Sequence, residues 1–174
     1  VIIRSSLLAD HGGFWLDAAV FCANPVPEEV FRSPLFTCRS DHLTVEKYVS
    51  RYRWTSFAIG GWRSHHLFEA MRDFYHAYWS SESRIIDYLL IDYMIDICYR
   101  HMPSIRKDID RITLSNPRVD DLVNVLSGTY DDDAWSDLQR ETWMFKLTWR
   151  LPFLEQTEDG SLTFYGKLVR GELV

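Results

Sequence analysis

The chain of 174 residues is 47% hydrophobic and 25% charged, a composition that suits one soluble domain with a sizeable core. Its formal net charge of −6 argues against the strongly basic surface of a nucleic-acid-binding module, so we expect no nucleic-acid partner. No apolar run is long enough to cross a membrane, and three widely spaced cysteines form no disulfide or zinc pattern, so a reducing cytoplasm is expected.

The first part of the chain predicts a helix that leads into a buried strand. Residues 1–11 resemble the end of a helix, and a Gly-Gly pair follows it as a stop signal. Its apolar side carries three aliphatic residues: Ile3, Leu7 and Leu8. The nearly continuous apolar run 14–21 predicts a buried strand with one charge, Asp17. Such a carboxylate needs a hydrogen bond, an ion pair or a metal, although capping the next turn would satisfy it equally well.

The middle of the chain predicts mainly helices. Three prolines indicate a loop over 24–34, and short strands are expected at 35–39 and 55–60. Apolar residues then recur at helical spacing over 66–79. The segment 84–100 is apolar around its whole circumference, which is typical of a buried helix.

Three acids interrupt that apolar segment: Asp87, Asp92 and Asp96. At 100° per residue, Asp92 and Asp96 lie on similar faces of the predicted helix and Asp87 lies far round from both. A carboxylate desolvated in this way has a raised pKa and can accept a proton from a hydroxyl group. The alternative is structural, with one acid capping the helix and the others bonded to neighbouring arginines.

The last third predicts shorter elements. Helices are expected to begin at Pro103, at Asn116-Pro117 and in 131–133. Strict alternation of aromatic or aliphatic residues with polar ones predicts a strand at 142–150, and 163–169 is expected to be extended. The predicted fold class is mixed α/β with a largely helical middle, in which 14–21 and 142–150 share one sheet.

Several short motifs occur together in an order that resembles a known family. The segment 7–20 contains G-G-x-W-x-D-A, which is similar to the helix–Gly-Gly–strand element of glycosyltransferases with a DXD sugar-binding motif. Its particular form resembles the capsular polysaccharide synthesis protein family. Further matches, in the family's order, lie at 54–61, 86–93, 145–149 and 163–166.

This resemblance implies a partial GT-A, Rossmann-like glycosyltransferase domain that uses a nucleotide-sugar donor. Because the chain starts at Val1, we expect residues 1–174 to be the C-terminal part of that domain, with the nucleotide-binding part preceding it. The resemblance gives Asp17 the role of holding a divalent cation, Mg²⁺ or Mn²⁺, against the diphosphate. Ala19 stands where the second acid of D-x-D is expected, which leaves a cation to be shared with substrate phosphates.

Further residues complete the predicted site. The resemblance places Lys146 against the diphosphate, where positive charge would stabilise the leaving group, although a solvated lysine on a sheet would look the same. Asp87 and Asp92 are the predicted catalytic or sugar-binding acids. His65-His66 is interpreted as a helix-entry turn, because adjacent side chains rarely chelate one ion.

The function expected from these residues is transfer of a sugar from a nucleotide-sugar donor to a glycan or lipid-linked glycan acceptor. A cytoplasmic protein is expected, with peripheral association at the inner face of the membrane. One rival hypothesis is a non-catalytic carbohydrate-binding or scaffold domain of a capsule assembly complex, which Ala19 favours slightly. A helical interaction module is a further alternative, against which the strand patterns count.

Overall fold

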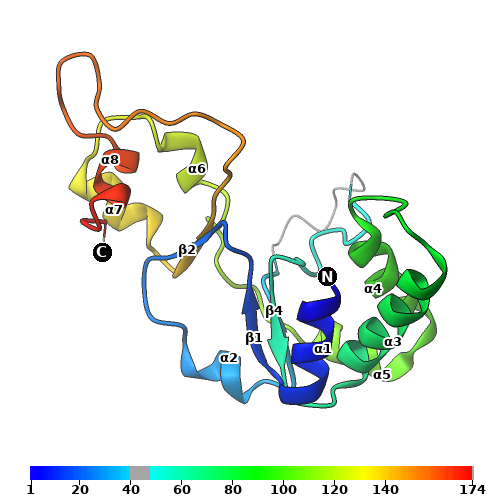
Figure 1. Cartoon of the computed structure of the whole chain (residues 1–174). Helices are drawn as coiled ribbons and strands as arrows, with labels where there is room; N and C mark the ends of the chain where they lie inside the picture. The colour runs from blue at the N-terminus through cyan, green and yellow to red at the C-terminus, as the bar shows by residue number, and fades with distance from the viewer. Residues whose placement is uncertain (40–47, 174) are drawn as a thin grey trace. The chain divides into compact units, whose positions relative to one another are not determined.

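The computed structural model describes residues 1–39 and 48–173, which form two compact units (Figure 1). Unit 1 comprises Val1–Leu16 and Pro27–Leu114, and unit 2 comprises Asp17–Val26 and Ser115–Val174. Each unit has its own hydrophobic core. In the described part of the chain, no helix combines the length and hydropathy that a membrane span requires.

Unit 1 is built on a three-stranded antiparallel sheet. Strand β4 (Ala58–Gly61) lies between β1 (Gly13–Leu16) and β3 (Leu35–Thr37). All four residues of β4 are buried. Gly60 is required there because a Cβ atom would lie 2.4 Å from the backbone oxygen of Gly13 on the neighbouring strand. The close spacing of β1 and β4 therefore depends on a residue without a side chain.

Five helices complete the described part of unit 1: α1 (Ile2–His11), α2 (Glu28–Arg32), α3 (His66–Ser81), α4 (Leu90–His101) and α5 (Pro103–Asp110). Helix α3 packs against α1 and α4, and α4 packs against α5 (Figure 1). Large side chains from the helices and from the end of the 48–57 segment fill the core; they include Trp54, Phe68, Met71, Tyr75 and Ile95.

Several expectations for unit 1 are confirmed, namely the helix over 1–11, the strands near 35–39 and 55–60, and the helices over 66–79 and from Pro103. The apolar side assigned to the first helix is wrong for two of its residues. Ile3 is 70% exposed and Leu7 is 46% exposed, whereas Ser5 and Ala9 are buried together with Leu8. Helix α1 packs against α3 and buries two small residues beside Leu8, so its orientation does not follow hydropathy alone.

The predicted buried helix over 84–100 is shorter and less buried than expected. Residues 81–89 are all exposed, Ile86 and Tyr88 to 80% each, and the helix begins only at Leu90. Within α4 the apolar residues divide between a buried side and exposed positions such as Ile97. A continuous apolar sequence therefore did not mean burial on every side. The loop expected at 24–34 likewise contains the short helix α2.

Unit 2 contains a two-stranded antiparallel sheet, in which β2 (Val20–Cys22) pairs with β5 (Met144–Lys146). Three short helices accompany it: α6 (Leu122–Val125), α7 (Asp132–Leu138) and α8 (Phe164–Val169). Its core gathers around aromatic rings, with Trp135 centred 5.7 Å from Phe145 and 6.5 Å from Phe164. Helix α7 starts as predicted, because the Asp131 side chain accepts a hydrogen bond from Ala134 N at 2.8 Å.

The single strand predicted at 14–21 is wrong. A turn in which Val20 N donates to the Asp17 backbone oxygen at 2.9 Å splits it into β1 and β2, which pair in different sheets. The expected pairing with 142–150 is correct for β2 alone, which pairs with β5. Strand 142–150 is itself reduced to Met144–Lys146. The apolar residues continue through the turn between Asp17 and Val20, so hydropathy alone gave no sign that one strand ends there and another begins.

Two further expectations in unit 2 are corrected. Asn116 does not cap a helix; it adopts a positive φ of 51°, and its Oδ1 accepts hydrogen bonds from Trp143 N and Met144 N. Residues 163–169 are helical rather than extended, because the Thr163 hydroxyl oxygen accepts from Gly166 N at 2.9 Å and starts α8.

The mixed α/β class with a largely helical middle is confirmed. The Rossmann-like GT-A architecture is not confirmed, since both sheets formed by the described residues are small and antiparallel, whereas a Rossmann sheet is mostly parallel.

Candidate functional site

Asp92 is a half-buried carboxylate in the first turn of α4. Its Oδ1 accepts a hydrogen bond from the indole Nε1 of Trp54 at 3.1 Å. Burial raises the pKa of Asp92, while the Trp54 hydrogen bond and the charge of Arg4 lower it. A carboxylate with a raised pKa in a fixed orientation is suited to accept a proton from a hydroxyl group.

The side chains around Asp92 come from several elements of unit 1. The guanidinium of Arg4 on α1 donates to the backbone oxygen of Ser56 and lies 5.1 Å from the centre of the Trp15 ring. Tyr75 on α3 is fully buried, and burial with the nearby charge of Asp92 raises its pKa to about 12. The surroundings of Asp92 therefore combine one cation, one neutral hydroxyl group and one indole donor.

Asp96, one turn further along α4, has a structural role. It is 8% exposed and forms ion pairs with Arg53 at 3.4 Å and with Arg100 at 2.6 Å. The guanidinium of Arg53 also stacks over the rings of Trp54 and Tyr99, at 4.9 Å and 4.2 Å from their centres. Two cations neutralise this buried acid, which leaves Asp92 as the desolvated acid with a raised pKa on this helix.

Asp87 lies in the exposed segment before α4 rather than on the helix. Its Oδ1 accepts a hydrogen bond from Leu89 N at 2.7 Å, and its backbone oxygen accepts from Leu90 N at 3.2 Å. The side chain thus forms a local turn that leads into α4. Asp87 and Asp92 belong to the same unit, but their environments differ in exposure and in partners.

The two residues predicted to face the diphosphate, Asp17 and Lys146, both belong to unit 2. Asp17 is half-buried and begins the turn into β2, whose first residue, Val20, lies opposite Lys146 on β5. The neighbouring Leu147 N donates to the backbone oxygen of Ala19 at 2.8 Å. The turn that carries Asp17 is therefore joined directly to the strand end that carries Lys146.

Asp120 is an acid beside Lys146 that sequence reasoning missed. Lys146 N donates to the backbone oxygen of Val119 at 2.7 Å, which brings the segment before α6 alongside β5. Partial loss of solvent around the Asp120 carboxylate raises its pKa, and the negative charge of Asp121 raises it further. The positive charge of Lys146 lowers it. In the sequence, Asp120-Asp121 gives little indication of a functional site, because such acidic pairs in irregular segments are common on solvated surfaces.

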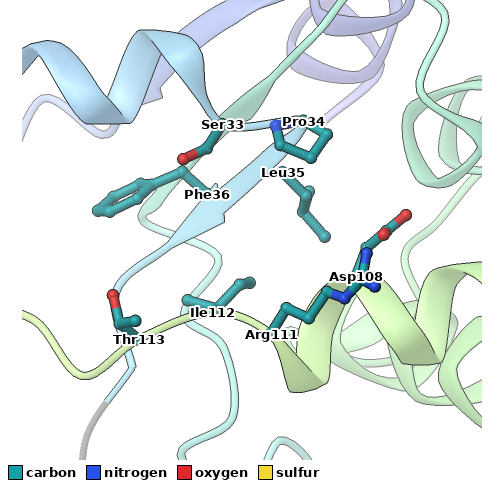
Figure 2. A pocket seen from close by; sticks show the side chains of 8 residues that line it. All are labelled: Ser33, Pro34, Leu35, Phe36, Asp108, Arg111, Ile112 and Thr113. Atoms are coloured by element: carbon teal, nitrogen blue, oxygen red, sulfur yellow. The ribbon is translucent and has the colours of Figure 1, made fainter.

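A pocket of about 320 Å³ lies between β3 and the end of α5 in unit 1 (Figure 2). Figure 2 shows Asp108 and Arg111 on one side of it and Phe36 on the other, with the apolar side chains of Leu35 and Ile112 between them. The lining combines charged, hydroxyl and apolar groups, and its volume is large enough for one small polar molecule.

His65 fixes the orientation of Asp108 at this pocket. Its Nδ1 accepts a hydrogen bond from Leu67 N at 3.2 Å, so the ring proton is on Nε2, which donates to Asp108 Oδ2 at 3.2 Å. Burial lowers the pKa of His65 despite the nearby carboxylate, which agrees with a neutral ring. The expected helix-entry role is confirmed, since His65 caps α3.

Comparison with known proteins decides the family. The model of the capsular polysaccharide synthesis protein family matches residues 2–168, nearly the whole chain. The chain belongs to this family. The family's name points to a role in capsular polysaccharide synthesis. No curated protein and no solved structure matches the chain significantly.

The candidate charged residues of this chain lie in both units. Unit 1 holds Asp92, with a raised pKa, and the pocket beside Asp108, whereas unit 2 holds Asp17, Lys146 and Asp120. The described residues contain no group of three or more His, Cys, Asp or Glu side chains placed to hold a metal ion.

Proposed function

We propose that this member of the capsular polysaccharide synthesis protein family is a glycosyltransferase that moves a sugar from a nucleotide-sugar donor to a hydroxyl group of a glycan or lipid-linked glycan. The observation that carries the proposal is Asp92, a half-buried carboxylate with a raised pKa, oriented by the indole of Trp54. Glycosyl transfer needs a group that removes the proton of the acceptor hydroxyl as the new bond forms, and Asp92 has the chemistry for this.

In the proposed reaction, the acceptor oxygen forms a bond to the anomeric carbon as the bond from that carbon to the diphosphate oxygen breaks. The acceptor proton passes to the carboxylate of Asp92, and the nucleoside diphosphate leaves with its electron pair. Trp54 keeps one oxygen of Asp92 in place, so the other is available to the acceptor. Asp87, which is exposed, would bind sugar hydroxyl groups on the way into the site.

Within unit 2, we propose that Lys146 binds the diphosphate of the donor, because its positive charge opposes the negative charge of the phosphates. Asp17 is the proposed ligand of a divalent cation. We propose that a Mg²⁺ or Mn²⁺ ion at Asp17 would take its other ligands from the donor phosphates and water, because Ala19 supplies no second carboxylate. When bound, such an ion would neutralise phosphate charge.

The pocket beside Asp108 supports recognition of a sugar in unit 1. Leu35 and Ile112 offer an apolar surface to the C–H face of a sugar ring, while Asp108 and Arg111 offer an acceptor and donors to its hydroxyl groups. We propose that one residue of the acceptor glycan binds here. An Arg111→Ala variant should raise KM for the acceptor and leave kcat nearly unchanged.

The experiment that tests the function is a transfer assay on the full-length enzyme with a panel of nucleotide sugars. Asp92→Asn keeps an oxygen that accepts from Trp54 but removes the base, so transfer should fall by about two orders of magnitude or more. Asp73→Asn, on an exposed side chain of α3, is the matched control and should transfer at the wild-type rate. Equal rates for wild type and Asp92→Asn would refute the assignment.

A non-catalytic carbohydrate-binding or scaffold role is the second candidate, and one observation favours it. Ala19 occupies the place of the second acid in D-x-D, which weakens cation binding at Asp17. Hydrolysis of the donor separates the two functions, since a binding or scaffold domain does not cleave the bond between the sugar and the diphosphate. A full-length protein that binds the glycan but neither hydrolyses nor transfers any donor would support the scaffold role.

A further inference from the structure

The hydroxyl group of Tyr75 is buried in unit 1 and has no hydrogen-bond partner among the described residues. Tyr75 lies on α3, and its ring belongs to the hydrophobic core of unit 1. A buried polar group without a partner destabilises a protein, so its presence is explained by a catalytic role or by an ordered water or ion. The proton transfer to Asp92 does not by itself use this hydroxyl group.

Packing alone does not account for a tyrosine at this position. The Tyr75 ring meets Phe74 edge to face, with the ring centres 5.1 Å apart, and a phenylalanine would supply the same ring. Tyr78 on the same helix shows an ordinary use of the hydroxyl group, which donates to the Arg84 backbone oxygen at 2.7 Å and accepts from Ile86 N at 2.9 Å. No described backbone group bonds to the Tyr75 hydroxyl in this way.

Two charged side chains lie near the Tyr75 hydroxyl, namely Arg4 on α1 and Asp92 on α4. Burial is the main cause that raises the pKa of Tyr75 to about 12; the charge of Arg4 lowers this pKa, and the charge of Asp92 raises it. The hydroxyl group is therefore protonated at neutral pH and can donate a hydrogen bond. Because α3 packs against both α1 and α4 (Figure 1), the three side chains converge in one polar cluster of the core.

Asp92 can accept a further hydrogen bond. Among the described residues, Trp54 Nε1 is the one donor to its side chain, and it bonds to Oδ1 at 3.1 Å. An ionised carboxylate offers about four lone-pair positions on its two oxygens. Oδ2 can therefore accept from a hydroxyl group of the substrate and, at the same time, from a second donor inside the protein.

A water molecule is the group that fits between Tyr75 and Asp92. The two side chains form no direct hydrogen bond, and a ligand that enters from solvent does not reach a hydroxyl group that is shielded from solvent. Internal water molecules make about three hydrogen bonds to buried polar groups that the chain leaves unsatisfied. We propose that one buried water molecule accepts a hydrogen bond from the Tyr75 hydroxyl and donates one to Oδ2 of Asp92, which makes Tyr75 a positioning residue of the proposed base.

The water holds the second oxygen of Asp92 and favours the ionised carboxylate, so Tyr75 lowers the pKa that burial raises. Three other groups near this cluster do not change charge between acidic and neutral pH in a way that would hide the effect. Arg4 stays a cation, the Tyr78 hydroxyl is bonded to backbone groups, and Asp96 is neutralised by two arginines.

The test compares Tyr75→Phe with wild type in the 174-residue chain. The carboxyl carbon of Asp92, assigned by its loss in Asp92→Asn, is titrated by nuclear magnetic resonance. Tyr75→Phe keeps the ring and removes the donor, so the pKa of Asp92 should rise further. Tyr93→Phe removes an exposed hydroxyl group from the residue next to Asp92 and is the matched control, which should titrate like wild type. An unchanged Asp92 pKa in Tyr75→Phe would overturn the proposal.

Unfolding stability gives a second measurement that does not depend on sugar transfer. A hydroxyl group with a partner stabilises the fold, so Tyr75→Phe should raise the unfolding equilibrium constant by about two- to tenfold at neutral pH. The increase should be smaller in acid, where Asp92 is protonated. A variant as stable as wild type at neutral pH, or more stable, would contradict the proposal, because a hydroxyl group without a partner is a cost.

A high-resolution crystal structure of the wild type keeps the test decisive if the variant does not fold. It should show a water molecule within hydrogen-bond distance of both the Tyr75 hydroxyl and Asp92 Oδ2. A structure with the two side chains ordered and no water between them would reject the proposal.

The effect of Tyr75 on catalysis rests on the proposed function. In the full-length enzyme, the acid limb of the kcat profile should move to higher pH in Tyr75→Phe, with KM for the acceptor nearly unchanged. A merely structural role for Tyr75 would lower activity at every pH without moving that limb. A shifted Asp92 titration in a protein that transfers no sugar would reject the proposed function and leave the water-mediated contact intact, so the two failures are distinguishable.

Discussion

The hydrogen bond from Trp54 to Asp92 allows a sharp test of the electrostatics in unit 1. Trp54 is 1% exposed, and its Nε1 donates to Asp92 Oδ1 at 3.1 Å. Trp54→Phe keeps an aromatic ring but removes the donor. A hydrogen bond to a charged group contributes about 1.5–3 kcal/mol, and we expect the lower end because Asp92 is only half-buried. Loss of ring volume in a packed core adds about 1 kcal/mol or more.

The pH dependence of the stability lost in Trp54→Phe separates the contribution of the hydrogen bond to Asp92 from that of the lost ring volume. Burial already raises the pKa of Asp92, so ionisation of this group costs stability as pH rises through its folded pKa. The Trp54 bond lowers that pKa, and its removal must raise the pKa further. Trp54→Phe should therefore destabilise the protein more at neutral pH, where Asp92 is ionised, than in acid, where it is protonated. The cavity contribution is the same at both pH values.

Urea unfolding at neutral and acidic pH, followed by near-UV circular dichroism, measures both contributions. Because the chain divides into two compact units, a separate transition is fitted for unit 1 wherever the unfolding curve shows two steps. Trp62→Phe, at a residue 57% exposed, is the control and should change stability little. In a double-mutant cycle with Asp92→Ala, the coupling energy should be about 1.5 kcal/mol at neutral pH. A coupling near zero, or an equal loss at both pH values, would refute the reasoning.

Four other changes have defined outcomes. Gly60→Ala should destabilise the chain by about 1–3 kcal/mol in urea unfolding, because its Cβ would meet the backbone of β1. Thr163→Ala should cost about 1 kcal/mol through loss of the cap of α8, and Thr163→Ser should restore it. The lowered pKa of His65 means that its stabilising contribution is complete above its unfolded pKa and is lost as pH falls towards the folded pKa. His65→Asn keeps a capping side chain and should flatten that acid-side loss, as measured by thermal unfolding over a pH series. Asp17→Asn in the full-length enzyme should melt like wild type and lose most of kcat, whereas a near wild-type rate would remove Asp17 from the site.

The sequence by itself determined the elements whose signals are local. Apolar residues at helical spacing predicted α3, and Pro103 predicted the start of α5. Asp131 predicted the start of α7 because a cap acts on the next turn of its own helix. The ordered motifs predicted the family, which the match over residues 2–168 confirms. Each of these signals depends on neighbours within a few positions along the chain.

Tertiary structure alone decided which elements meet and which groups lose their water. The apolar run 14–21 contains no sign that a turn at Asp17 sends its two halves to different sheets, because hydropathy does not specify a partner strand. The raised pKa of Asp92 depends on burial and on an indole 38 residues away. Asp120 became a candidate only where β5 brought Lys146 beside it. Desolvation and Coulomb interactions depend on distance in space, and only the folded chain sets those distances.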